Sequence, residues 1–192
     1  MGGRPKALIE RDGVPLVRRV TQALLDAGVH HVVVVLGHRA DAVAAALAGL
    51  PVACAVNDHY GDGRVSSLRA GLSALPDGVE AIVVALADQP LLGAEDVRAL
   101  LRAFGDSRPA RAVVPRVRGV RGHPVVFEAG VGREILQRDA DFGARHWLQE
   151  HPAQLSWFDN DNDHYCVDID APEDLARVER QHGCTLRWPA DS

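Results

Sequence analysis

Short, continuously apolar runs alternate with helical patterns along the first half of this 192-residue chain, and this alternation constrains its fold more than any other feature. Residues 30–37 (HHVVVVLG), 52–56 (VACAV) and 80–88 (EAIVVALAD) have the character of strands buried on both faces. Apolar residues at helical spacing cover the segments between and around them, residues 14–27, 39–50, 65–75 and 93–104. The order predicts an α/β sandwich around a mostly parallel sheet.

The second half of the chain has a different order of expected helices and strands. Two further strands are expected at residues 111–119 and 123–127, joined by a loop rich in arginine and glycine. Two helices, two strands and a closing helix are expected after them, at residues 128–138, 141–150, 155–160, 166–170 and 171–183. The length suits one domain with a substantial core, over residues 1–183, followed by a loosely attached tail, residues 184–192.

Composition and charge exclude several function classes. The formal net charge is −5 and no block of lysine and arginine offers a phosphate-binding stripe, so we expect no nucleic-acid partner. The apolar runs are far shorter than a membrane span, and the polar, glycine-rich start does not resemble a signal peptide. The three cysteines are widely spaced and form no metal-binding pattern. We therefore expect a cytoplasmic protein with no membrane partner.

Lys6 is the only lysine among 21 basic residues, and it lies just ahead of the first predicted helix. Together with Gly2 and Gly3 it resembles part of a loop whose backbone N–H groups and lysine contact phosphate oxygens. These residues alone do not form a complete phosphate-loop motif, and an ordinary surface lysine on a frayed terminus is the alternative. The alternation also requires a strand before the first helix, and no strand-forming run precedes it here.

Three aspartates are candidates for a metal site. Asp88 follows the apolar run of residues 80–88, at an edge of the sheet where ligands bind, and its carboxylate could hold Mg²⁺ against phosphates. A turn stabilised by Asp88 ahead of Pro90 is the alternative. Asp168 and Asp170 are two residues apart, so on a strand they would share a face and could share a cation. Alternatively, Asp170 caps the closing helix.

Arg121 and His123 lie in the stretch GVRGHPV, residues 119–125, which forms a loop leading into a predicted strand. Their charge and hydrogen-bonding capacity could hold an anionic second substrate. A hairpin turn with solvated arginines is the alternative reading of the same residues.

Five motifs occur in a fixed order along the chain: MGGRPKAL, SSLRAGL, ADQPL, RGHPVVF and DIDAPEDL. In this order they resemble the molybdenum cofactor cytidylyltransferase-like branch of the MobA-like nucleotidyltransferases, from residue 1 to about residue 180. The resemblance implies a Rossmann-like sandwich. In that family a strand and a loop similar to L-A-A-G-x-S-x-R precede the M-G-x-P-K motif, so MGGRPKAL corresponds to the second half of a nucleotide-binding loop.

The resemblance also implies a role for each motif residue. Lys6 would contact the triphosphate, with Gly2 and Gly3 lining the loop. The nucleoside would be contacted by Ser66, Ser67 and Arg69. Asp88 and Asp170, together with Asp168, would bind Mg²⁺, and Lys6, Asp88 and Asp170 would be the catalytic residues. Gly122, His123 and Pro124 would face a phosphorylated acceptor.

The implied reaction moves a nucleoside monophosphate, CMP from CTP, onto an acceptor such as molybdopterin and releases pyrophosphate. A molybdoenzyme client is a further partner that this reaction suggests. Two alternatives stay open at this point. One is transfer of GMP or another nucleotide to a different acceptor. The other is a non-catalytic, cofactor-binding relative that has lost its phosphate loop.

Overall fold

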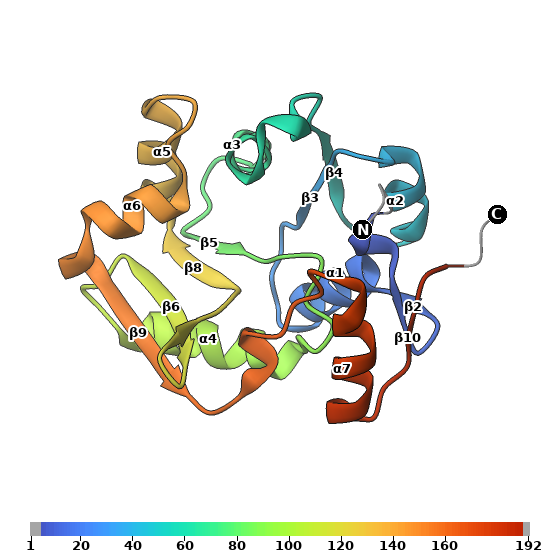
Figure 1. Ribbon diagram of the computed structural model, residues 1–192. Coiled ribbons are helices and arrows are strands. Elements are labelled where there is room, and N and C mark those ends of the chain that lie inside the picture. Colours follow the sequence, from blue (N-terminus) through green and yellow to red (C-terminus); the bar gives the residue numbers. More distant parts are fainter. Residues whose placement is uncertain (1–4, 190–192) are drawn as a thin grey trace.

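Helices and strands alternate through residues 5–189, the part of the chain that this computed structural model describes (Figure 1). Gly2 and Gly3 therefore lie outside the described residues. The strands are β1 Glu10–Arg11, β2 Val14–Pro15, β3 Val33–Leu36, β4 Ala53–Val56, β5 Ala81–Val84, β6 Ala112–Val117, β7 Val120–Arg121, β8 Val125–Glu128, β9 Leu155–Asn160 and β10 Leu186–Arg187. The helices are α1 Leu16–Asp26, α2 Ala40–Ala46, α3 Arg64–Ser73, α4 Ala94–Asp106, α5 Ala129–Gln137, α6 Ala144–Glu150 and α7 Pro172–His182.

The central sheet consists of two separate parts. In one part β3 pairs in parallel with β4. In the other part β8 pairs antiparallel with β5 and β6, and β9 runs parallel to β6. Among residues 5–189 no ladder joins β3 to β5, although these two strands face each other across the middle of the molecule (Figure 1). The α/β class is thus confirmed, with a sheet of mixed direction.

Helices cover both faces of the larger part of the sheet. On β6 and β8, Val113 and Val126 face α4, where they pack against Leu100. Their neighbours along the strands face the other way and pack around Trp147 of α6. Successive residues of a strand point to opposite faces, so continuous apolar runs such as these bury both faces at once.

The smaller part of the sheet is more exposed than the sequence predicts. We expect residues 52–56 to be buried, but β4 is an edge strand and 63% of Val56 is exposed. The middle of β3 is only half-buried. The burial of a strand depends on the neighbours it finds, and each of these strands has a covered side and an open side.

The chain around Asp88 and Asp168 also differs from expectation. β5 ends at Val84, so Asp88 lies four residues beyond the strand rather than at its end. The predicted strand at residues 166–170 does not form, because this segment has no strand beside it. Instead it runs past the Asp88 segment, and the Ile169 N–H donates to the Asp88 carbonyl at 3.1 Å.

A third, small sheet joins the two ends of the described chain. β1 and β2 form a hairpin through Asp12 and Gly13, whose positive φ angles of 54° and 81° suit a tight two-residue turn. β10 pairs with β1, and Leu186 is buried in the core beside Ile9. Residues 184–189 are therefore part of the fold and not a loosely attached tail. The Asp-Gly pair was the sequence signal for this hairpin.

Across residues 5–189, no helix combines the length and the apolar composition that crossing a membrane requires.

Candidate functional site

Four of the predicted site residues come together where the segments after β5 and before α7 meet. The hydrogen bond from Ile169 to the Asp88 carbonyl holds the chain of Asp168 and Asp170 alongside Asp88. Lys6 reaches this group from the other end of the sequence, and its Nζ donates to Asp170 Oδ1 at 2.6 Å. Three distant stretches of sequence thus place three carboxylates and one ammonium in one region.

The electrostatics of the acids suit a cation. Burial raises the pKa of Asp88, and the charges of Asp168 and Asp170 raise it further, while its own backbone N–H and Lys6 lower it. Burial also raises the pKa of Asp168, with Asp170 adding to the effect. Carboxylates that are buried next to one another resist ionisation, and a bound cation relieves that cost.

Asp88 Oδ1 is the best candidate for a metal-ligating atom. It is buried, and it has no hydrogen-bond partner among the residues that the structure describes. Within the same residues, no three His, Cys, Asp or Glu side chains are grouped as a complete metal site. Magnesium commonly takes one or two carboxylates and fills its other positions with water and substrate phosphates, so an open acidic site fits it. Asp88, Asp168 and Asp170 as magnesium ligands stay a prediction.

The start of α7 explains why Asp170 is available. Asp174 Oδ2 accepts from the backbone N–H groups of Ala171 at 2.8 Å and Asp170 at 2.9 Å. Asp174 therefore caps this helix, from its third position, and the alternative in which Asp170 is the cap is wrong. The Asp170 carboxylate is left to pair with Lys6.

Lys6 is held by the turn to which it belongs. The turn Lys6–Leu8 is a short 3₁₀ helix, and Ala7 and Leu8 pack in the cluster that contains Leu36 at the end of β3 and Ala87 after β5. Lys6 therefore belongs to a packed turn, and its contact with a triphosphate stays a prediction. The carboxyl ends of β3 and β5 both border the place where Lys6 lies.

Ser66 and Ser67 lie in the first turn of α3, and Asn57 holds both of them. The buried amide of Asn57 donates to Ser66 Oγ at 3.0 Å and to Ser67 Oγ at 3.1 Å. The Asn57 backbone N–H donates to the Leu36 carbonyl at 2.8 Å, which ties this loop to the end of β3. The sequence analysis missed Asn57, although it opens a polar, glycine-rich loop directly after a predicted strand.

Arg69, predicted to contact the nucleoside, binds the end of a neighbouring helix in this structure. Its guanidinium donates to backbone carbonyls at the end of α5, to Ile135 at 2.6 Å and to Leu136 at 3.1 Å. These contacts satisfy carbonyls that the end of a helix leaves unpaired. Arg69 thus fastens α3 to α5, and the structure does not bring it to the acidic group.

Gly122, His123 and Pro124 form a loop that presses against Tyr165. A Cβ at Gly122 would collide with the Tyr165 carbonyl, so only glycine fits there. The His123 N–H donates to the Tyr165 carbonyl at 2.8 Å. The buried amide of Gln89 donates to the carbonyls of His123 and Tyr165 at 3.1 and 3.2 Å. Gln89, which the sequence analysis also missed, follows Asp88 in the chain and thus links this loop to Asp88.

Basic side chains surround His123. Burial lowers the pKa of His123, and the charges of Arg121 and Arg64 lower it further, while the Val84 carbonyl raises it. Partial burial lowers the pKa of Arg121, and Arg145 at the start of α6 adds to this effect. The lowered pKa keeps His123 neutral at pH 7 beside the positive charges of Arg121 and Arg64, and such a group favours an anion.

Known proteins share sequence with most of this chain. The sequence profile of the MobA-like NTP transferase domain matches residues 1–155. Nicotine blue oxidoreductase of Paenarthrobacter nicotinovorans is 34% identical over 184 residues, which are 93% of this chain and 89% of that protein. A probable molybdenum cofactor guanylyltransferase of Natronomonas pharaonis is 36% identical over 116 residues, or 60% of this chain and 55% of that protein.

A solved structure has a similar fold. A nucleotidyl transferase from Methanothermobacter thermautotroptrophicus aligns with a TM-score of 0.73 and 25% sequence identity, covering 92% of this chain and 84% of that one.

Proposed function

Because this chain belongs to the MobA-like NTP transferase family, we propose that it transfers CMP from CTP to a phosphorylated acceptor of the molybdopterin type and releases pyrophosphate. The observation that carries the proposal is the meeting of Lys6, Asp88 and Asp170 at the carboxyl ends of β3 and β5. In open α/β sheets this edge is where ligands bind. A molybdoenzyme that receives the product would be a client of the protein.

In the proposed reaction, an oxygen of the acceptor phosphate attacks the α-phosphorus of the triphosphate. A new P–O bond forms, and the bond from the α-phosphorus to the bridging oxygen breaks, so that pyrophosphate leaves with the electron pair. Positioning and charge neutralisation are what such a transfer requires, and no protein nucleophile takes part. Magnesium, when bound by Asp88 and Asp170, supplies positive charge that stabilises the departing pyrophosphate.

The side chains divide these tasks by position. Lys6 is partly exposed and uses one of its three N–H donors on Asp170, so the others can reach phosphate oxygens. The first turn of α3 offers Ser66 and Ser67 to the nucleoside side, with Asn57 fixing both hydroxyls.

The acceptor would lie beside the loop of residues 122–124, which Gln89 links to Asp88. His123 and the charges of Arg64 and Arg121 form a surface that suits an anionic phosphate. Gln89 links that surface to the acidic group through its two hydrogen bonds.

Thermal unfolding with CTP, GTP, ATP and UTP, each with and without Mg²⁺, is the first test, because selective binding to the native state raises the midpoint. We expect a shift with CTP that needs Mg²⁺. A shift with GTP instead would move the protein to the guanylyltransferase class that one relative represents. No shift with any nucleotide would favour a binding protein without transferase activity.

Release of pyrophosphate in the presence of CTP, Mg²⁺ and molybdopterin is the second test. The matched control is the Asp77→Asn variant, since Asp77 is exposed in the loop after α3. If Asp88→Asn releases pyrophosphate as fast as Asp77→Asn does, the assignment of Asp88 as a catalytic residue is contradicted.

A second candidate function comes from the relative that aligns over 93% of this chain and is named an oxidoreductase. Reduction of nicotine blue by the purified protein, followed by absorbance, tests it directly. Activity there that survives in the Asp88→Asn variant would separate that reaction from nucleotidyl transfer.

A further inference from the structure

A polar group that the proposed function does not use lies where the turn after β9 meets the start of α4. Its centre is the buried side chain of Asp96. Asp96 Oδ2 accepts from the Gly93 N–H at 2.8 Å, which caps the helix. The same carboxylate also accepts from the Asn162 amide at 2.7 Å and from His164 Nδ1 at 3.0 Å. Capping does not require these two further bonds, so they have another purpose.

The bonds from Asn162 and His164 fasten the 3₁₀ turn Asp163–Tyr165 to α4. A carboxylate only accepts hydrogen bonds, so the proton of the His164 contact is on Nδ1. The buried Tyr165 side chain makes a third connection to the same helix, because its hydroxyl donates to the Asp96 backbone carbonyl at 2.8 Å. All three connections end at Asp96, which therefore fixes the place of Tyr165.

Tyr165 in turn holds the loop of residues 122–124. Its backbone carbonyl accepts from the His123 N–H at 2.8 Å and from the Gln89 amide at 3.2 Å. The chain that leaves the turn continues into the acidic segment, where the Ile169 N–H donates to the Asp88 carbonyl. The turn thus connects the loop of residues 122–124 to the acidic group.

We infer that the pair Asp96 and His164 is a positioning element that sets the acceptor loop, residues 122–124, relative to Asp88. Neither residue of the pair would touch a substrate, since both act through the Tyr165 carbonyl and its bond to His123. Without the pair, the turn would separate from α4 and the loop would lose its support, whereas the nucleoside side, carried by α3, would keep its contacts. The effect on an acceptor rests on the proposed function, and the chain of contacts does not.

The test compares two substitutions of His164 in the full chain. His164→Leu cannot donate to Asp96, whereas the amide nitrogen of His164→Asn can take the place of Nδ1. Both variants keep the Gly93 contact that caps α4. His30→Leu is the matched control, because His30 is exposed and lies ahead of β3. Exchange of the His123 amide is measured by NMR without substrates, with the amides of β4 as the internal reference.

We expect His164→Leu to speed exchange of the His123 amide about tenfold, and His164→Asn and His30→Leu to stay within about twofold of the unchanged protein. Unchanged exchange in His164→Leu would overturn the inference. An equal rise along the whole of α4 would overturn it too, since that result would report a loosened helix and not a released loop.

Kinetics with CTP and molybdopterin separate positioning from a merely structural role. We expect His164→Leu to lower kcat/KM for molybdopterin about tenfold and to leave the KM for CTP within about twofold, with most of the loss recovered in His164→Asn. Equal losses toward both substrates would contradict a positioning role. If the unchanged protein transfers no nucleotide, the proposed function fails, and the exchange of the His123 amide decides the inference by itself.

Discussion

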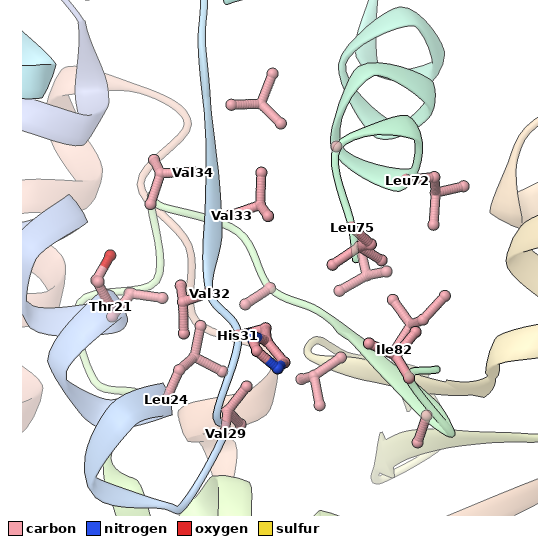
Figure 2. A pocket seen from close by; sticks show the side chains of 18 of the residues that line it. Thr21, Leu24, Val29, His31, Val32, Val33, Val34, Leu72, Leu75 and Ile82 are labelled. Carbon is pink, nitrogen blue, oxygen red and sulfur yellow. The ribbon is translucent and has the colours of Figure 1, made fainter. Parts of the chain in front are cut away.

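The two parts of the central sheet have similar sequences and different environments. β3 and β8 are both short runs of large apolar residues, yet β8 is buried through Val125, Val126 and Phe127, whereas the middle of β3 is half-buried. β8 has a strand on each side and helices on both faces, and β3 has a strand on one side and, on the other, a cavity of about 760 Å³ that residues of β3 and β5 line (Figure 2). The difference teaches that an apolar run specifies a buried strand only when partners fill both of its edges.

The candidate site spans both parts of the sheet. Asp88 follows β5 of the larger part, and the loop of Gln89 and His123 belongs to it too. Lys6, Asn57 and Ser66 depend on the smaller part, through Leu36 at the end of β3. Asp88 is thus held by the larger part of the sheet, and Lys6 packs against the end of the smaller part.

The largest effect is expected from Asp88→Asn. Removal of this charge should lower the rate of pyrophosphate release on the order of a hundredfold or more, because charge stabilisation at the reacting phosphates is lost. Circular dichroism should stay unchanged, since Asp88 Oδ1 has no protein partner among the described residues. A rate within twofold or so of the Asp77→Asn control would remove Asp88 from the chemistry.

The two parts should also differ in their response to cavity-forming substitutions. Val126→Ala, at a fully buried position, should lower the free energy of unfolding by about 2 kcal/mol. Val33→Ala, at a half-buried position that lines the cavity, should lower the free energy of unfolding by about half as much or less. Urea denaturation of both variants measures this, and equal losses would show that β3 is as firmly packed as β8.

Lys6→Ala tests the side of the site that packs against the smaller part of the sheet. We expect triphosphate affinity to fall about tenfold, since a charge-assisted contact to phosphate is removed. Lys6→Arg is the conservative control and should recover part of the affinity. Titration calorimetry measures the triphosphate affinity of both variants. If Lys6→Ala binds as tightly as the unchanged protein, Lys6 does not contact the triphosphate.

The smallest expected effect is a pH dependence of stability, which comes from residues around the larger part of the sheet. The hydrogen bond from Arg111 holds the pKa of Glu134 below its ordinary value of 4.5, with Trp147 assisting. A lowered pKa in the folded state stabilises the protein above the unfolded pKa, and that stability is lost as pH falls through the folded value. Solvent screens this pair, so the contribution at pH 7 should be about 0.5 kcal/mol.

Glu134→Gln provides the measurement. The difference in unfolding free energy between the protein and this variant should be present at pH 7 and vanish in acid. A difference that persists unchanged below the folded pKa would assign it to packing against Trp147 and not to charge.

The sequence predicts most elements well, because apolar spacing reflects burial on a helix or a strand. It misplaces residues 166–170, where Val167 and Ile169 alternate with aspartates as they would on a strand. Those two side chains are buried, but the Val167 N–H donates to the Asp163 carbonyl and the Ile169 N–H to the Asp88 carbonyl, in place of a neighbouring strand. An alternating apolar pattern in the sequence indicates which side chains are buried, but it does not indicate which groups hydrogen-bond to the backbone.

The site was predicted in the same uneven way. The structure brings Lys6, Asp88 and Asp170 together, and the sequence singles them out because charged residues stand out at strand ends and before helices, while their roles stay a prediction. Arg69 matched a motif but binds the end of α5, a contact 66 residues away that no local pattern reveals. Gln89 and Asn57 act by hydrogen-bonding backbone and hydroxyl groups, and an amide side chain in a loop gives little signal of that.

The contact between Gly122 and the Tyr165 carbonyl sets a rule for engineering this protein. A library that tests the proposed acceptor site can vary Arg121 and Arg145, whose charges influence each other. Position 122 must stay glycine, because any side chain would push the loop off Tyr165 and drag the His123 and Gln89 contacts with it. Directed evolution of this loop should therefore vary the neighbours of Gly122 and keep Gly122 itself unchanged.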